Sequence, residues 1–194
     1  MGRPRSFDEG EVIRTARDTF WRQGYAGTSL ADLTQATGLH KPSLYGAFGD
    51  KSDLFLAAVA QYRSEGSQRM ARALAAPRLR TSVEQIFRVD LDVFSPRHRG
   101  CLVLCVAAAA VSEDPRIAAV VREALANSSH AVQARVERAE PLERPPGLSL
   151  SATTELVIST HLALAVRSRL GESRRRLRQR ANDVIDVFPS AAIT

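Results

Sequence analysis

Residues 28–48 constrain the fold of this 194-residue chain more than any other segment. Ser29 and Asp32 have the spacing of a capping box, which predicts a helix that begins at Leu30. Gly38 can adopt the positive φ that ends a helix in a tight turn, and a second short helix is predicted after it. The segment is therefore expected to form a helix-turn-helix unit.

The apolar and polar residues of this segment are predicted to face opposite ways. Those expected to turn inward against a third helix are Leu30, Leu33, Leu39, Leu44 and Phe48. Those left on the outside of the second helix are His40, Lys41, Ser43 and Tyr45. Hydrogen-bond donors on such a helix suit contacts with phosphates and base edges in the major groove of DNA. Taken alone, the segment also fits a helical hairpin that merely has a polar face.

A further helix is predicted before this unit. Ser6 and Glu9 have the spacing of a second capping box, so this helix is expected to begin between them. It is expected to end at Gly24, and Tyr25 is expected to plug the underside of the three-helix unit. The three helices together predict a small DNA-binding domain.

A short basic arm precedes the first predicted helix. It contains Arg3 and Arg5 on either side of a proline, which prevents a helix there. Such an arm can lie along the minor groove or the phosphates beside the main contact. An ordinary disordered terminus is the alternative.

Four stretches carry a resemblance to a known family. They are residues 2–5 (GRPR), 20–25 (FWRQGY), 28–33 (TSLADL) and 43–51 (SLYGAFGDK). Through them, residues 2–55 resemble the DNA-binding domain of the TetR family of bacterial transcriptional regulators. The resemblance implies that phosphates are contacted by Thr28, Lys41, Ser43, Tyr45 and Lys51. It also implies that bases are read around His40, Lys41 and Pro42, with Gly46 close to the DNA.

The rest of the chain is predicted to be helical, which makes the fold class all-α with about nine helices. Helices are expected over residues 51 to about 75, from a capping box at Thr81 and Glu84, over 101–111 as a central buried helix, from the cap at Asp114 to about 138, over 151–170 and over 173–188. The proposed division is a helix-turn-helix domain over residues 1–51 and a helical effector-binding and dimerisation domain over residues 52–194.

The last two predicted helices carry apolar stripes that fit a dimer interface. The stripe residues are Leu156, Ala163, Val166, Leu170, Leu177, Ala181, Val184, Ile185 and Phe188. A palindromic operator requires two reading helices at a fixed spacing, so a protein of this kind needs a dimer. In the resembled family, the last two helices of each subunit build a four-helix interface. The alternative is that these stripes only cover the core of the domain itself.

An effector cavity is expected among the helices of the second domain. The residues predicted to line it are Tyr62, Phe87, Phe94, Cys105 and His161, because such pockets are mostly apolar with a few polar groups. Cys101 and Cys105 lie one helical turn apart, so a thiol-based redox sensor is the alternative. A direct disulfide within one helix is disfavoured by its geometry.

Enzymatic chemistry has no support in the sequence. It contains no glycine-rich phosphate loop, no HExxH motif and no GxSxG motif. The four histidines are scattered, so no metal site and no cofactor are predicted. An enzyme that used Cys101 or Cys105 as a nucleophile would need a base that the local sequence does not supply.

Charge and hydropathy agree with a DNA-binding protein without proving one. The net charge is +6, but the first 51 residues contain seven basic and six acidic residues, so placement matters more than total charge. Residues 174–180 hold five arginines, which fit an exposed helix face better than a second nucleic-acid site because no aromatic residues are interleaved. The longest apolar run has about eleven residues, and about twenty are needed to span a bilayer. A cytoplasmic location is expected.

These observations predict a homodimeric, one-component transcriptional regulator. It is expected to be a repressor that a small, mostly apolar effector releases from a palindromic operator in double-stranded DNA. A constitutive architectural DNA-binding protein is a further alternative, although the long helical second domain suits an effector better.

Overall fold

Eight α-helices make up most of the computed structural model, which describes residues 7–95, 97 and 99–190. They are α1 (Glu9–Gln23), α2 (Leu30–Thr37), α3 (Lys41–Phe48), α4 (Lys51–Leu74), α5 (Leu79–Phe94), α6 (Pro115–Glu137), α7 (Leu150–Arg169) and α8 (Arg174–Ile185). Three short segments add a π-helical turn η2 (Val103–Ala107) and 3-10 turns η3 (Ala108–Ala110) and η4 (Pro141–Glu143). No strand occurs in the described residues, which confirms the all-α class.

The N-terminal three-helix unit forms much as its caps predict. The capping box of Ser29 and Asp32 is present at the start of α2, and Gly38 ends that helix with φ 69°. The start of α1 differs from the prediction, because Asp8 is its N-cap and accepts a hydrogen bond from the Glu11 amide at 3.2 Å. The predicted cap, Ser6, lies outside the described residues.

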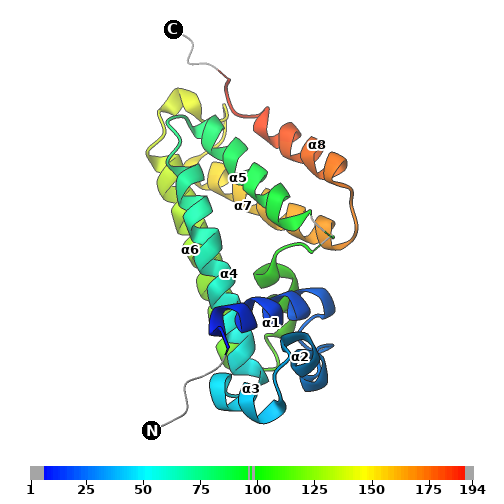
Figure 1. Ribbon diagram of the computed structural model, residues 1–194. Coiled ribbons are helices and arrows are strands. Elements are labelled where there is room, and N and C mark those ends of the chain that lie inside the picture. Colours follow the sequence, from blue (N-terminus) through cyan, green and yellow to red (C-terminus); the bar gives the residue numbers. More distant parts are fainter. Residues whose placement is uncertain (1–6, 96, 98, 191–194) are drawn as a thin grey trace.

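The helices form an elongated molecule with the helix-turn-helix unit at one end (Figure 1). The long helix α4 leaves this unit and runs beside α6, while α1 lies across its first half. Helices α5 and α7 pack together in the other half, and α8 packs on both. Buried apolar residues of all eight helices join in one core. In the described residues, we find no helix with the length and apolar character needed to cross a membrane.

The predicted cap of α5 is wrong. The helix begins one turn earlier than expected, at Leu79, whose side chain is only 1% exposed. Glu84 does not reach back to Thr81, because it accepts a hydrogen bond from Arg80 at 3.1 Å. Burial of Leu79 in the core therefore sets the start of this helix, and its N-cap makes no side-chain hydrogen bond.

The segment predicted as a central helix over residues 101–111 is helical, but it is not a regular α-helix. Its backbone forms the π-helical turn η2 followed by the 3-10 turn η3, and it is buried over much of its length, although Val111 is 41% exposed. Gly100 precedes it with φ 64°, and a Cβ atom there would lie 2.6 Å from the Ala165 carbonyl oxygen of α7. Gly100 therefore lets the chain pass close to α7 immediately before this segment.

Candidate nucleic-acid interface

Helix α3 presents an open polar face at one end of the molecule. His40 is its N-cap, in extended conformation, and its side chain makes no capping hydrogen bond. The side chains of Lys41, Ser43 and Tyr45 are exposed with it. A helix N-terminus also offers unpaired backbone N–H groups and a favourable dipole for an anion. The face can therefore donate hydrogen bonds to phosphates and to base edges.

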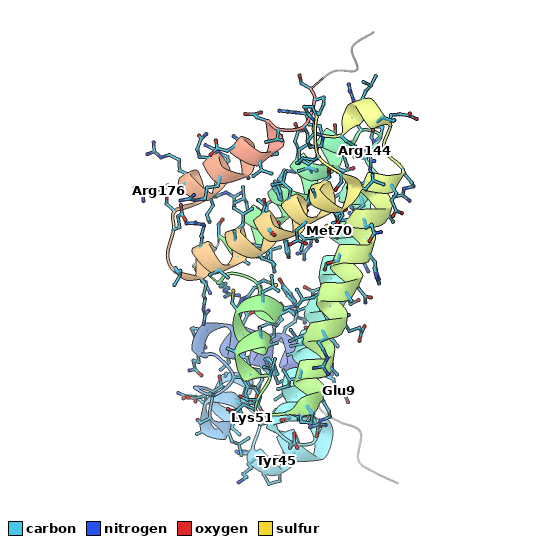
Figure 2. The ribbon with its side chains drawn as sticks, turned by 180° about the vertical axis from the view of Figure 1, so that it is seen from behind. Glu9, Tyr45, Lys51, Met70, Arg144 and Arg176 are labelled. Atoms are coloured by element: carbon cyan, nitrogen blue, oxygen red, sulfur yellow. The ribbon has the colours of Figure 1, made fainter. Side chains whose placement is uncertain are left out.

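Two aromatic–cation contacts hold the basic residues near this face. The Lys41 ammonium lies 5.7 Å from the Tyr45 ring centroid, and the Lys51 ammonium lies 4.4 Å from that of Tyr25. The Tyr25 hydroxyl is in turn 2.7 Å from the Ser52 hydroxyl at the start of α4. Tyr45 and Lys51 lie together at the lower end of the molecule in Figure 2. The aromatic rings thus orient the ammonium groups of Lys41 and Lys51, and neither lysine is buried.

Three small residues of the predicted interface differ in exposure. Pro42 is exposed, and a Cβ atom built on Gly46 would meet no atom within 4 Å, so both leave room for an approaching ligand. Thr28 is a correction, because its side chain is 1% exposed and its hydroxyl donates to the Gly24 carbonyl at 2.6 Å. Its hydroxyl closes the turn after α1 and is not open to a phosphate in this structure. Arg3 and Arg5 lie outside the described residues.

The residues predicted to line an effector cavity lie in the interior between α4, α5 and α7. Phe94 packs edge-on against His161 with ring centroids 5.5 Å apart, and Phe87 is buried in the core. Tyr62 donates a hydrogen bond to the Cys101 sulfur at 3.4 Å, and burial raises its pKa well above the usual value. The half-buried Cys105 thiol instead faces the Ala165 carbonyl at 3.6 Å.

A buried acid–base pair lies in this interior, which the sequence did not reveal. Nδ1 of His161 is 2.9 Å from both carboxylate oxygens of Asp90, whose side chain is 2% exposed. Burial acts to lower the pKa of His161, but the charge and hydrogen bond of Asp90 outweigh it and raise the pKa. The two residues are 71 positions apart, so no local spacing could indicate their pairing.

The predicted dimer stripe separates into two groups. Four of its residues are core residues of the single chain and are corrections to the prediction: Leu177, Ala181, Ile185 and Phe188. The other five remain at least partly exposed: Leu156, Ala163, Val166, Leu170 and Val184. Val166 is 48% exposed and Leu170 is 80% exposed. The available apolar face is therefore on α7, with α8 at its margin.

A groove of about 370 Å³ lies between α7 and α8 on this side. Its lining residues are Leu156, Ser159, Thr160, Ala163, Leu164, Arg167, Arg180, Asp183 and Val184. Both signs of charge flank the apolar floor, so the surface can complement a second copy of itself across a two-fold axis. This is the remaining basis for the predicted interface.

Comparison with known proteins assigns the chain to a family. The family model described as "Bacterial regulatory proteins, tetR family" matches residues 12–58. A solved structure described as a putative TetR transcriptional regulator from Rhodococcus sp. RHA1 is 30% identical, with a TM-score of 0.62, and the match covers 95% of this chain and 100% of that one. This protein belongs to the TetR family. It is thus a DNA-binding transcriptional regulator.

Two further TetR-type relatives match nearly the whole chain. The regulator CifR, solved as a cysteine mutant in complex with 26-bp double-strand operator DNA, is 29% identical with a TM-score of 0.86, covering 97% of this chain and 100% of that one. The HTH-type transcriptional repressor ComR of Escherichia coli (strain K12) is 26% identical over 198 residues, covering 97% of this chain and 92% of ComR. YezE of Bacillus subtilis (strain 168) is 33% identical, but only over 61% of this chain and 62% of its own length.

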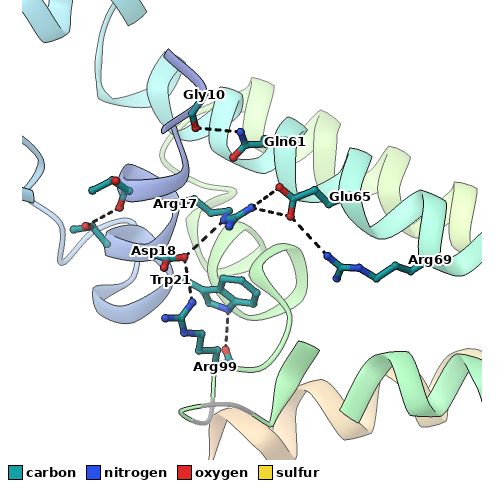
Figure 3. A network of polar contacts seen from close by, with 10 residues as sticks. Gly10, Arg17, Asp18, Trp21, Gln61, Glu65, Arg69 and Arg99 are labelled. Carbon is teal, nitrogen blue, oxygen red and sulfur yellow. Dashed lines mark hydrogen bonds and ion pairs between the residues drawn. The ribbon is translucent and has the colours of Figure 1, made fainter. Parts of the chain in front are cut away.

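A polar network at the end of α1 joins the TetR-type DNA-binding unit to the rest of the protein (Figure 3). Arg99 donates to the Asp18 carboxylate at 3.1 Å, and the Arg99 carbonyl accepts a hydrogen bond from the Trp21 indole at 3.0 Å. Arg17 forms an ion pair with Glu65 of α4 at 3.0 Å. These partners are 48 to 81 residues apart in the chain, so sequence reasoning could not identify them.

Proposed function

We propose that this TetR-family protein is a homodimeric repressor that binds a palindromic operator through α3 and is released by a small, mostly apolar effector. The exposed donor face of α3, which carries His40, Lys41, Ser43 and Tyr45, is the observation on which the proposal rests. The operator complex of the similar regulator CifR supports it. The proposal places the protein in the cytoplasm and assigns it no catalytic activity.

The proposed dimer forms through the α7–α8 groove, which lies away from the DNA-binding end. Residues 1–51 are proposed to bind DNA, and residues 52–194 to dimerise and to bind the effector. Two reading helices at a fixed separation can then match the two halves of a palindrome. The exposed apolar face of α7 supports this arrangement, because contiguous apolar surface of this kind favours a protein partner.

The proposed effector enters between α4, α5 and α7. Tyr62, Cys105 and the His161–Asp90 pair supply polar groups in an interior otherwise formed by apolar side chains such as Phe94. An effector bound there acts on α4, the helix that follows Lys51, and changes the separation of the reading helices. The effector releases the DNA if it binds more tightly to the state in which the separation of the two reading helices does not match the operator.

The DNA contacts can be tested by substituting single phosphate anchors. A duplex is first selected by the wild-type protein from random DNA, and its affinity is then measured against salt concentration. Lys51→Ala is expected to lower the affinity for all sequences and to reduce the salt slope by about one, because one cation fewer meets the phosphates. Tyr45→Phe is expected to weaken all sequences similarly, whereas His40→Ala is expected to alter the preferred bases.

A matched control separates these effects from net charge. Arg122→Ala removes an exposed arginine of α6 and is expected to leave the affinity and the salt slope unchanged. Wild-type affinity in both Tyr45→Phe and Lys51→Ala would contradict the assigned contacts. Failure of the wild-type protein to select any sequence would contradict the proposed function itself.

A further inference from the structure

Trp21 is held from several sides at the junction between the DNA-binding unit and the rest of the chain. Its indole N–H donates to the Arg99 carbonyl at 3.0 Å, and its own carbonyl accepts a hydrogen bond from Arg169 at 2.6 Å. The Arg99 guanidinium lies 5.3 Å from its ring centroid, and the Tyr62 ring packs edge-on at 5.0 Å. Trp21 is only 6% exposed. We call Trp21, Arg99 and Arg169 the Trp21 clamp.

The Trp21 clamp connects α1 directly to α7. Arg169 is the last residue of α7, and Arg167, two residues earlier, lines the groove between α7 and α8. The segment that carries Arg99 is itself pressed against α7, because Gly100 approaches the Ala165 carbonyl too closely for any side chain. The Ser168 hydroxyl of α7 also donates to the Phe94 carbonyl at 2.6 Å. A shift of α7 must therefore move Trp21 or break these hydrogen bonds.

A second set of contacts ties α1 to α4. Arg17 pairs with Glu65, and the Gln61 amide donates to the Gly10 carbonyl at 3.3 Å. Helix α1 is thus supported from α4 along its length and from α7 at its C-terminal end. With α4 contacts alone, α1 could still tilt about that helix. The clamp removes this freedom because it fixes the far end of α1.

We propose that Arg169 and Arg99 are positioning residues for operator recognition, which set the separation of the two reading helices by locking α1 to α7. The inference rests on the proposed dimer and operator. In a dimer built on α7, the separation depends on how each DNA-binding unit is oriented relative to that helix. Loss of the clamp loosens this orientation, so a mutant dimer tolerates half-site spacings that the wild type rejects.

The test compares binding to duplexes that differ only in half-site spacing. The selected duplex is remade with one base pair added or removed between its halves, and a single half-site is included. Arg169→Ala is expected to bind the selected spacing about tenfold more weakly, as for loss of a hydrogen bond from a charged donor, and to discriminate less among spacings. Single half-site affinity is expected to stay at the wild-type level. Arg122→Ala serves as the charge-matched control.

Trp21 supplies a direct readout, because it is the only tryptophan of the chain. In Arg169→Ala its fluorescence is expected to become more accessible to acrylamide, while sedimentation still shows a dimer. If circular dichroism shows that Arg169→Ala does not fold, Arg169→Lys carries the test, since it keeps the charge and the stem but loses the guanidinium geometry.

The outcomes distinguish the clamp from the function on which it rests. An unchanged spacing preference in the folded variant overturns the inference and leaves the proposed function intact. An equal loss of affinity for every duplex, including the single half-site, also overturns it, because it indicates a merely structural role. If the wild type selects no palindromic sequence, the proposed function and the inference fail together.

Discussion

The pairing of His161 with Asp90 places an ionisable contact in the apolar interior. The folded-state pKa of His161 is raised above its ordinary value of 6.5 by the carboxylate, despite burial. Protonation is therefore favoured by folding, and the stabilisation is complete below pH 6.5. It is lost as the pH rises through the raised pKa of the folded state.

Substitution of His161 is accordingly expected to have a pH-dependent cost. His161→Gln leaves the buried carboxylate without its charged partner and is expected to lower the free energy of unfolding by about 3–5 kcal/mol at about pH 6. The difference from wild type is expected to shrink at about pH 9. Urea denaturation at both pH values measures this difference in the free energy of unfolding. His130→Gln, on the exposed side of α6, is the control for loss of a histidine outside the pair. A difference that does not vary with pH would contradict a protonated pair.

Burial disfavours the thiolate form of both cysteines. Burial raises the pKa of Cys101 to about 11, despite the hydrogen bond from Tyr62, and burial also raises the pKa of Cys105. The thiolate is the reactive form, so at pH 8 only about one Cys101 in a thousand is reactive. This weighs against the thiol-sensor alternative.

Alkylation rates test that conclusion. In a Cys105→Ser background at pH 8, Cys101 of the native protein is expected to react with iodoacetamide at least about a hundredfold more slowly than in the urea-unfolded protein. Mass spectrometry over time gives both rates. Native labelling as fast as in the unfolded chain would restore the thiol-sensor hypothesis.

At the scale of elements, α8 shows why an apolar stripe alone does not define an interface. Its residues Leu177, Ala181 and Ile185 recur at helical spacing, as an interface stripe does, but they pack on α5 and α7 of the same chain. Sequence periodicity reports that a face is buried and not what buries it. The exposed residues of α7 are those still available to a partner.

Two aspartate substitutions separate core from interface. Val166→Asp places a charge on the exposed face of α7 and is expected to give a folded protein whose dimer is at least about tenfold weaker. Ile185→Asp places a charge in the core and is expected to unfold the chain. Sedimentation and circular dichroism together measure both results. A folded, dimeric Val166→Asp variant would exclude α7 as the seam.

Helix starts were predictable where a side chain caps the backbone locally. Ser29, Asp50, Asp114 and Ser173 are N-caps at predicted starts and accept hydrogen bonds in the structure. Asp8 and Ser149 also cap their helices, but neither was predicted as a cap. The starts of α5 and of the segment after Gly100 were not predictable, because distant packing determines them. The outward face of α3 follows from local pattern, whereas the Asp90–His161 pair and the Trp21 clamp depend on contacts between distant parts of the chain.

At the scale of the whole molecule, the arginines of α8 lie away from the DNA-binding end. Tyr45 and Lys51 mark that end in Figure 2, and Arg176 of α8 lies at the side of the opposite half. Arg174 of this helix pairs with Asp92, and Arg180 pairs with Glu172 at 2.8 Å. At physiological salt, exposed charges more than about 8 Å apart are largely screened from each other. Arginines in that half of the molecule are therefore expected to contribute little to operator binding.

A double substitution on α8 checks this separation. Arg175→Ala combined with Arg178→Ala removes two exposed positive charges and is expected to leave the salt slope of binding to the selected duplex unchanged. The same measurement on Lys51→Ala, with a slope smaller by about one, provides the comparison. A slope reduced by about two in the double variant would show that α8 also meets DNA.

The close packing at Gly100 predicts how the junction between α1 and α7 varies among related proteins. Its φ of 64° and its distance from the Ala165 carbonyl admit no other residue without displacing α7. In a related protein with another residue at this position, the added side chain would displace α7. An arginine at the position of Arg169 would then no longer reach the Trp21 carbonyl, so selection would not retain it for that contact. Glycine and arginine at these two positions are therefore expected to be kept together or lost together as related regulators diverge.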